Sequence, residues 1–447
     1  MTALKANASP TKAFFVKMLT RDISLDDCIL DLVDNSIDGA WSTSGQDPSV
    51  LSADSSLAGY FVDIQFSHQQ FIITDNCGGI NLNDASEYAF TFGRREEQER
   101  GGFTVGVYGI GMKRAVFKLG RSIEILSTYR SEGGLAAFEV PIEVDEWLAQ
   151  SSGPWDFDIE EHDPAKEPGV TIKVRDLTDE TTTRLGDPTY ARALRRMLAR
   201  DYMVPLMRGL EIRVNGEPVT GWKLELRENE SFAPMRSRYD DGEVSVEIVA
   251  GMFSPPPDDR EPDDQSKVSD VSGWYVLCNG RVVLAADTTV LTGWGVTLPK
   301  WHKQYTGFAG LVLFRAENPE LLPMTTTKRN VDVSSVVYQR ALNKMYKPAR
   351  AWVDYTNARK QNVESVRELE QSVTAIDVFS VPQREEVKLP EVARPATRER
   401  LANVNYAVPL RKLRALASGL GNASMSYRDV GLESFEYAFE DLADEVE

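Results

Sequence analysis

The sequence predicts an α+β protein made of two mixed α/β regions followed by a helical C-terminal region. A helical stretch at 12–40 precedes two short segments rich in β-branched and aromatic residues, YFVDIQF and QFIITD, within 60–75. A second group of such segments follows a helix expected at about 188–200. Helices beside short strands in this order fit a mixed sheet that is covered by helices on one face.

The length of the chain predicts several domains, because 447 residues exceed the usual size of a single hydrophobic core. Proline spacing and changes in pattern divide it further. The predicted parts are a first domain at 1–185, a second α/β domain at 186–332, a long helix at 333–375, a linker at 376–402 and a small helical unit at 403–447.

Composition argues against several classes of function. The formal net charge of -18 opposes non-specific binding to DNA or to an anionic membrane, although a local basic surface could override it. Three cysteines and three histidines lie far apart, which disfavours disulfide frameworks, zinc sites and histidine triads. The sequence contains no apolar run of eighteen residues and no apolar signal core, so we expect a cytoplasmic protein with no membrane partner.

The stretch DLVDNSIDGA at 31–40 carries unusually many acids for a partly buried helix. Asp31, Asn35 and Asp38 share one helical face, whereas Leu32 and Ser36 lie toward another. An unpaired buried carboxylate is costly, so this stripe must face solvent, a metal or a ligand. A solvated polar face is the alternative to a site.

The segment FIITDNCGGI places Asp75 at the end of an apolar strand, with two glycines after it. A fixed carboxylate can accept a hydrogen bond from an exocyclic amine, and glycines let the backbone approach a flat ring. A plain turn between strands is the alternative.

The segment GVYGIGMKRAVFKLG is a third candidate, because its glycines precede a helix that begins near Met112. Free amides at a helix N-terminus favour phosphate oxygens, and Lys113 would add a full positive charge.

Taken together, these three segments resemble the N, G1 and G2 boxes of the GHKL ATPase superfamily, which groups DNA gyrase B, a heat-shock chaperone, sensor histidine kinases and MutL. YGIGMK and the preceding TFGRR most resemble MORC-like bacterial ATP-binding proteins. The resemblance implies a Bergerat-type ATP-binding α/β sandwich, then a transducer-like α/β domain, then a helical C-terminal region.

Site roles follow from the resemblance. Asn35 would bind Mg²⁺, Asp31 would be the general base, and Asp75 would read adenine with Gly79 beneath the ring. The amides from Gly109 to Lys113 would hold the phosphates under a lid at about 92–111. Magnesium prefers oxygen ligands and keeps several waters, which suits one amide oxygen plus phosphates. The expected ATP-binding residues are Asn35, Asp38, Asp75, Gly79, Ile80, Gly106, Tyr108, Gly109, Ile110, Gly111, Met112 and Lys113.

Two positions depart from the family pattern. Asp31 is one methylene shorter than the usual glutamate, which predicts either that the attacking water sits closer or that hydrolysis is slow. Cys77 replaces a usual glycine, which matters if a positive φ is needed there. ATP binding is therefore better supported than turnover.

In the second domain, Lys328 of LPMTTTKRNVDV resembles the transducer lysine that reaches the γ-phosphate, and we expect it to act in catalysis. An ordinary surface lysine is the alternative. CNGRVVL at 278–284 resembles a transducer strand with an NGR turn. In the C-terminal unit, Tyr427, Phe435, Tyr437 and Phe439 would pack that unit or dock a partner.

These features predict a Mg²⁺-dependent ATPase switch that forms an ATP-dependent homodimer and acts on DNA or a partner protein. The MORC resemblance adds anti-phage defence as a setting. The alternatives are a chaperone-like protein clamp, or an ATP sensor with little turnover that regulates a partner through its C-terminal unit.

Overall fold

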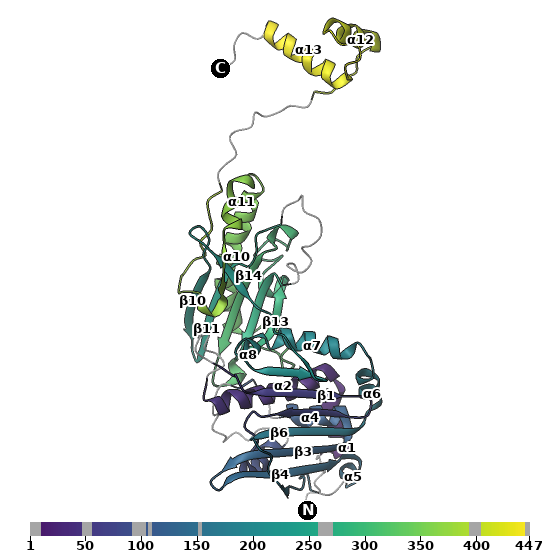
Figure 1. Ribbon diagram of the computed structural model, residues 1–447, viewed down its shortest axis with the longest axis vertical. Helices are drawn as coiled ribbons and strands as arrows, with labels where there is room; N and C mark the ends of the chain where they lie inside the picture. Colours follow the sequence, from purple (N-terminus) through teal and green to yellow (C-terminus); the bar gives the residue numbers. More distant parts are fainter. Residues whose placement is uncertain are drawn as a thin grey trace, which may run out of the picture. The chain divides into compact units, whose positions relative to one another are not determined.

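The computed structural model describes residues 10–46, 56–91, 104–105, 110–150, 154–257, 271–392 and 404–442 (Figure 1). The chain divides into two compact units, Met1–Arg394 and Pro395–Glu447. Among the described residues, the first unit contains two mixed sheets, a two-stranded antiparallel sheet and helices, and the second unit is helical. The predicted α+β class is confirmed.

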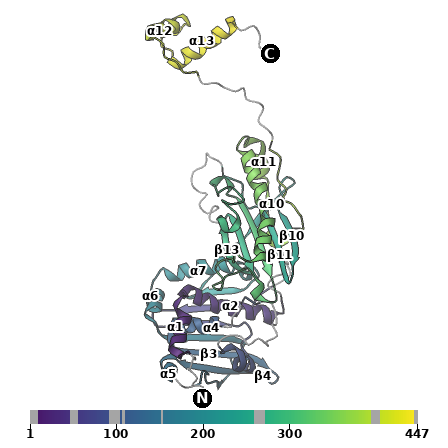
Figure 2. The same cartoon turned by 180° about the vertical axis from the view of Figure 1, so that it is seen from behind.

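The first domain is built on an eight-stranded sheet with the order β5-β4-β3-β6-β2-β1-β7-β8. Helices α1, α2 and α4 lie across one face of this sheet (Figure 2). The strands are β1 (Phe61–Phe66), β2 (Phe71–Asp75), β3 (Gly120–Ser131), β4 (Gly134–Glu143), β5 (Glu160–His162), β6 (Gly169–Leu177), β7 (Glu211–Val214) and β8 (Glu217–Pro218). The helices are α1 (Lys12–Arg21), α2 (Leu25–Ser44), α3 (Leu82–Asp84), the π-helix η1 (Ala85–Ala89), α4 (Gly111–Leu119), α5 (Val144–Ala149), α6 (Asp179–Leu185), α7 (Tyr190–Asp201) and α8 (Met203–Met207).

Helix α2 has strong signals at both ends. Ser24 caps its N-terminus by accepting from the Asp27 amide at 3.1 Å, and the Ser24 hydroxyl donates to the Asp27 carboxylate at 2.7 Å. Gly45 ends the helix with φ 65°, a left-handed conformation that glycine adopts without strain. Because of the break before Ser24, the helical stretch expected at 12–40 forms two helices.

The second domain contains a five-stranded sheet with the order β10-β11-β14-β12-β13. Helix α10 packs on one face, and α8 and η5 contribute to the apolar cluster on the other. The elements are β9 (Glu225–Glu228), β10 (Met235–Asp241), β11 (Val244–Met252), β12 (Gly273–Cys278), β13 (Arg281–Asp287), η2 (Val290–Thr292), η3 (Lys303–Tyr305), β14 (Phe308–Arg315), η4 (Pro319–Leu321), α10 (Val336–Arg359), α11 (Glu364–Gln371), β15 (Thr374–Asp377) and η5 (Val378–Ser380).

The segment EIRVNGEPV, assigned from sequence to the second domain, instead extends the first sheet. Strand β7 pairs in parallel with β1, with Phe61 opposite Glu211. Ile212 and Val214 are buried in the first core. A parallel pairing between segments so far apart leaves no local sequence signal, which explains the difference from the expected boundary at 185–186.

The region expected as a long helix and a linker is more structured than predicted. The helix at 333–375 is replaced by α10 and α11. Strand β15 pairs with β9, and two further bridges join Arg384 to Arg236 and Lys388 to Ala233. Residues 374–388 therefore form a strap along the second domain, where the sequence predicted part of the linker 376–402.

The second unit contains α12 (Leu410–Gly419) and α13 (Tyr427–Leu442). Within its described part, Ala417 and Val430 are the buried residues. Tyr427, Phe435, Tyr437 and Phe439 are all at least 46% exposed. The interpretation that these four aromatic residues pack the unit is therefore wrong, and their surface is open.

Replacing Phe379 by alanine tests whether the strap belongs to the folded body. Its ring is 5% exposed and lies 4.1 Å from the Arg208 guanidinium carbon. Phe379→Ala should lower the free energy of unfolding by about 3–5 kcal/mol, because a buried aromatic ring is lost. Chemical denaturation followed by tryptophan fluorescence measures this change.

The matched control is Phe14→Ala, whose ring is 58% exposed. That change should stay within about 0.5 kcal/mol. Equal effects of the two substitutions would contradict a packed strap.

Candidate functional site

The acidic stripe of α2 faces both the first turn of α4 and a loop of the second domain. Asp31 is buried, and its Oδ2 atom accepts from Arg114 Nη2 at 2.5 Å. A Cβ atom at Gly111 would lie 3.3 Å from Asp31 Cγ, so this glycine permits the close approach of the two helices. Asn35 is exposed, and the half-buried Asp38 accepts from the Val105 amide at 3.1 Å. The three stripe residues thus have three different environments.

Asp75 at the end of β2 is held by three hydrogen bonds. Its Oδ2 atom accepts from the Ser36 hydroxyl at 2.7 Å, and its Oδ1 atom accepts from the amides of Cys77 at 2.9 Å and Val170 at 3.2 Å. Burial raises the pKa of Asp75, although these bonds oppose the shift. A carboxylate has about four acceptor positions, so one stays available to a ligand amine. Ser36, expected on the aliphatic face, is in fact a direct partner of Asp75.

The glycines after Asp75 adopt conformations that other residues avoid. Gly78 has φ 114° and Gly79 has φ 75°, and a Cβ atom at Gly79 would lie 2.0 Å from the Thr128 carbonyl oxygen. Cys77 does not have a positive φ, so the cysteine fits here without strain. The Ser127 hydroxyl ties this loop to β3 by bonding both the amide and the carbonyl of Ile80, at 2.7 and 2.8 Å.

A cleft of about 420 Å³ opens beside these glycines. Its lining includes Gly78, Gly79, Tyr60, Tyr129 and Glu167. Aromatic rings and a flat glycine backbone suit a planar ligand group.

The third candidate segment is described in part. Ile110, Gly111, Met112 and Lys113 form the start of α4, whereas Gly106, Tyr108, Gly109 and most of the expected lid at 92–111 lie outside the described residues. Lys113 Nζ donates to the carbonyls of Ala89 at 2.7 Å and Thr91 at 2.6 Å. Burial lowers the pKa of Lys113 to about 8. Its ammonium is therefore directed at two backbone carbonyls, which differs from the expected phosphate contact.

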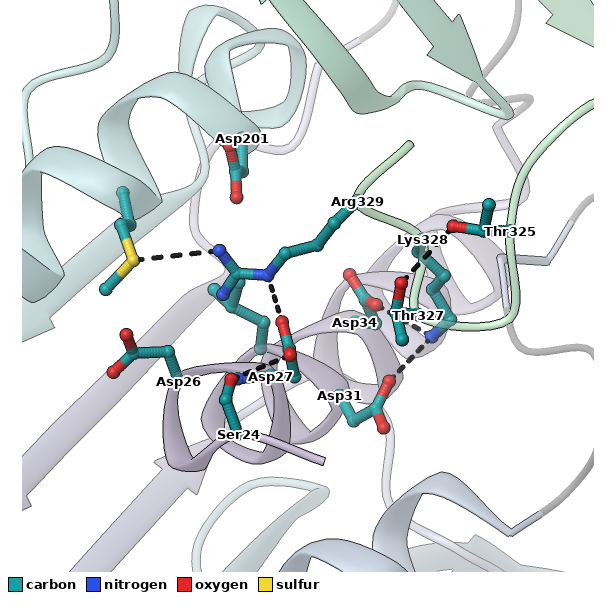
Figure 3. Close-up of polar contacts among 12 residues, drawn as sticks. Ser24, Asp26, Asp27, Asp31, Asp34, Asp201, Thr325, Thr327, Lys328 and Arg329 are labelled. Carbon is teal, nitrogen blue, oxygen red and sulfur yellow. Dashed lines mark hydrogen bonds and ion pairs between the residues drawn. The ribbon is translucent and has the colours of Figure 1, made fainter. Parts of the chain in front are cut away.

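Lys328 of the second domain reaches into the first (Figure 3). Its Nζ atom donates to Asp31 Oδ1 at 3.1 Å and to Asp34 Oδ2 at 2.8 Å. Burial by itself would lower the pKa of Lys328, but the two carboxylates outweigh it and raise the pKa above its usual value. The alternative of a surface lysine is wrong, because Lys328 is 8% exposed.

Asp34 was not recognised from sequence, although it is more buried than Asp31. It accepts from the Tyr202 hydroxyl at 2.7 Å, and Arg281 Nε lies 3.1 Å from its Oδ1 atom. Arg281 Nη1 lies 3.5 Å from Asp201 Oδ2. Burial would raise the pKa of Asp34, yet Lys328 and Arg281 outweigh it and lower the pKa. The sequence drew attention to Arg281 only through the NGR turn, and it predicted no contact or function for this arginine.

The same turn contacts the segment that precedes α4. Asn279 Nδ2 donates to the carbonyls of Thr104 at 3.0 Å and Ala316 at 2.9 Å. Thr104 adjoins Val105, whose amide binds Asp38. Residues 104–105 are thus held between α2 and the second domain.

Residues 23–165 match the family described as histidine kinase-, DNA gyrase B-, and HSP90-like ATPases. The part of the first domain at 23–165 is therefore of the GHKL type. No curated protein matches the chain. Because GHKL domains are ATPases, the match supports ATP binding and hydrolysis by this domain.

Asn35 is the residue that the sequence predicts as the Mg²⁺ ligand. No group of three or more His, Cys, Asp or Glu side chains that could hold a metal occurs among the described residues. The exposed Asn35 offers one amide oxygen. That donor set fits Mg²⁺ brought with a nucleotide, since Mg²⁺ is commonly held by few side chains plus phosphates and waters. No described helix is long and apolar enough to cross a membrane.

Gly79→Ala should disrupt the glycine loop after β2, which lines the cleft described above. The added Cβ would meet the Thr128 carbonyl, and the positive φ alone costs about 1–2 kcal/mol. We expect a loss of stability greater than this strain, together with weaker ATP binding in titration calorimetry.

Gly59→Ala is the control, because Gly59 has φ 93° but nothing within 4 Å of an added Cβ. It should show the backbone cost alone and unchanged ATP affinity. Equal behaviour of the two variants would show that the close approach at Gly79 is unimportant.

Proposed function

We propose that the chain is a Mg²⁺-dependent, ATP-driven switch in which the second domain reports on the nucleotide. The observation that carries the proposal is Lys328 Nζ, supplied by the second domain, 3.1 Å from the Asp31 carboxylate of the GHKL domain. A lysine in this position would gain a partner in the γ-phosphate of ATP but not in ADP. Such a differential contact is what a ligand needs to shift a conformational equilibrium.

In this proposal Asp31 is the general base, and Asn35 orients Mg²⁺, which would neutralise charge at the phosphates. Asp75 uses its remaining acceptor position for the adenine amine, with Gly79 and Ile80 beneath the ring. The amides at the start of α4, from Ile110 to Lys113, face the phosphates, as the positive end of a helix favours.

One observation favours a second function, an ATP sensor with little turnover. Both oxygens of Asp31 are occupied by cations, Arg114 at 2.5 Å and Lys328 at 3.1 Å. A general base must offer an acceptor position that the attacking water can reach, and the Asp31 carboxylate is 5% exposed with a cation at each oxygen. Turnover then requires Lys328 to leave Oδ1, which would make hydrolysis slow.

In this proposal the ATP-bound protein forms a homodimer, and the dimer acts on a further macromolecule, either DNA or a protein. The resemblance to MORC-like proteins supports an ATP-dependent dimer acting on DNA in anti-phage defence. The exposed aromatic residues of the second unit support a protein partner instead. Stimulation of ATP hydrolysis by DNA would favour action on DNA over action on a protein partner and over a chaperone-like clamp.

The mass of the protein in solution tests the dimer. With Mg²⁺ and a non-hydrolysable ATP analogue, light scattering after size exclusion should give twice the mass found with Mg²⁺ and ADP. The same mass in both nucleotides, with binding of the analogue verified by calorimetry, would favour the sensor.

Asp31→Asn tests the base. The amide keeps the shape of the buried side chain but cannot take up a proton, so hydrolysis should fall at least about a hundredfold. Affinity for ATP should stay near that of the wild type, because Asp31 is not the adenine ligand. Phosphate release and calorimetry measure the two quantities, and undiminished turnover would exclude Asp31 as the base.

A further inference from the structure

Asp34 has no part in the chemistry proposed above, yet it is one of the most buried carboxylates in the described structure. It is 2% exposed, and three side chains from outside α2 converge on it. These are Tyr202, which follows α7, Arg281 at the start of β13, and Lys328 of the loop before α10. A carboxylate so far from water needs compensating charge and hydrogen bonds.

Different partners of Asp34 supply the compensating charge and the hydrogen bonds. Arg281 lies at ion-pair distance, but its Nε and Nη1 atoms make no hydrogen bond of good geometry. Lys328 Nζ and the Tyr202 hydroxyl are the groups that donate hydrogen bonds to Asp34, at 2.8 and 2.7 Å. Lys328 is therefore the cation that satisfies this carboxylate directly.

The two carboxylates that share Lys328 are not equivalent. Lys328 Nζ is nearer to Asp34, at 2.8 Å, than to Asp31, at 3.1 Å. Asp31 has a second hydrogen-bonded cation in Arg114, at 2.5 Å. If Lys328 moves off Asp31, that carboxylate keeps a donor. The ammonium also keeps a carboxylate, because Asp34 lies on the same helix one turn later.

We propose that Asp34 is the positioning residue for Lys328: it holds the ammonium in the interior, keeps the loop of the second domain docked on α2, and lets Asp31 Oδ1 be vacated. Arg281 supports this role because its guanidinium lies at ion-pair distance from both Asp34 and Asp201 and so compensates their negative charges. Only the effect on catalysis rests on the proposed ATPase function; the anchoring of Lys328 does not.

Anchoring is measured by the acylation rate of Lys328, followed by peptide mass spectrometry on the full chain with acetic anhydride as the probe. Only the free amine reacts, and the Asp34 carboxylate raises the pKa of Lys328. Asp34→Asn should accelerate acylation about tenfold for each unit by which that pKa falls. The exposed Lys360 serves as the internal reference in every sample.

Glu370→Gln is the matched control. Glu370 is 2% exposed and accepts from a tyrosine hydroxyl, Tyr355 at 2.5 Å, and from Arg359 at 2.6 Å. Its neutralisation removes a buried carboxylate of the same kind away from Lys328. Acylation of Lys328 should match the wild type in this control. Equal rates in wild type, Asp34→Asn and Glu370→Gln would overturn the proposal.

Thermal unfolding of a second set of variants decides the question if Asp34→Asn folds poorly. Lys328→Met should lower Tm because it leaves the buried Asp34 carboxylate without its ammonium. Adding Asp34→Asn to Lys328→Met should recover most of that loss, whereas adding Glu370→Gln should lower Tm further. Independent, additive losses for Asp34 and Lys328 would contradict anchoring.

The kinetic consequence is a fall in kcat with little change in KM. Asp34→Asn should reduce kcat about tenfold or more, since Lys328 is misplaced. It should have no further effect in the Lys328→Met background. A kcat equal to that of Glu370→Gln would overturn the catalytic part. A wild type that binds no ATP would refute the proposed function, while the acylation and unfolding results would still decide the anchoring.

Discussion

An ammonium from one domain, buried between two carboxylates of the other, is the interaction on which the arrangement of the first unit depends. Lys328, Asp31 and Asp34 are each at most 8% exposed. Moving Lys328 away while the two carboxylates stay buried would leave them without this cation, and a buried carboxylate that loses its partner is strongly unfavourable. The docking of the domains and the assembly of the site are therefore one event, since the same three side chains serve both (Figure 3).

Helix α2 allows the two domains to meet at these carboxylates because each of its faces contacts a different part of the structure. Ile29 and Val33 pack in the core of the first domain. Asp31 faces the first turn of α4, and Asp34 faces the second domain. The Ser24 cap fixes where the helix begins. Because the helix turns by about 100° per residue, inserting one residue within it would rotate the side chains on one side of the insertion relative to those on the other.

How much of this could be read from the sequence depended on the distance between partners along the chain. The GHKL resemblance followed from three short local segments taken together, although each of them alone left a plain structural alternative open. The role of Asp34 could not be predicted in this way, because its partners lie far away in the sequence; Tyr202, for example, is 168 residues from Asp34. The β7 pairing and the strap were missed for the same reason. The contacts of Lys113 with the carbonyls of Ala89 and Thr91 were not predicted, because a glycine-rich segment before a helix gives no direction for a long flexible side chain.

The aspartate at position 31 is matched to its surroundings. A glutamate at this position would extend the carboxylate by one methylene toward α4, which Asp31 faces. Here Gly111 already lies so close that a Cβ atom would be 3.3 Å from Asp31 Cγ and 3.4 Å from Oδ2. The space between α2 and α4 is filled by the shorter acid, with Arg114 in hydrogen-bond contact. A longer acid would have to displace α4 or lose one cation, so the narrow spacing of the helices and the short side chain depend on each other.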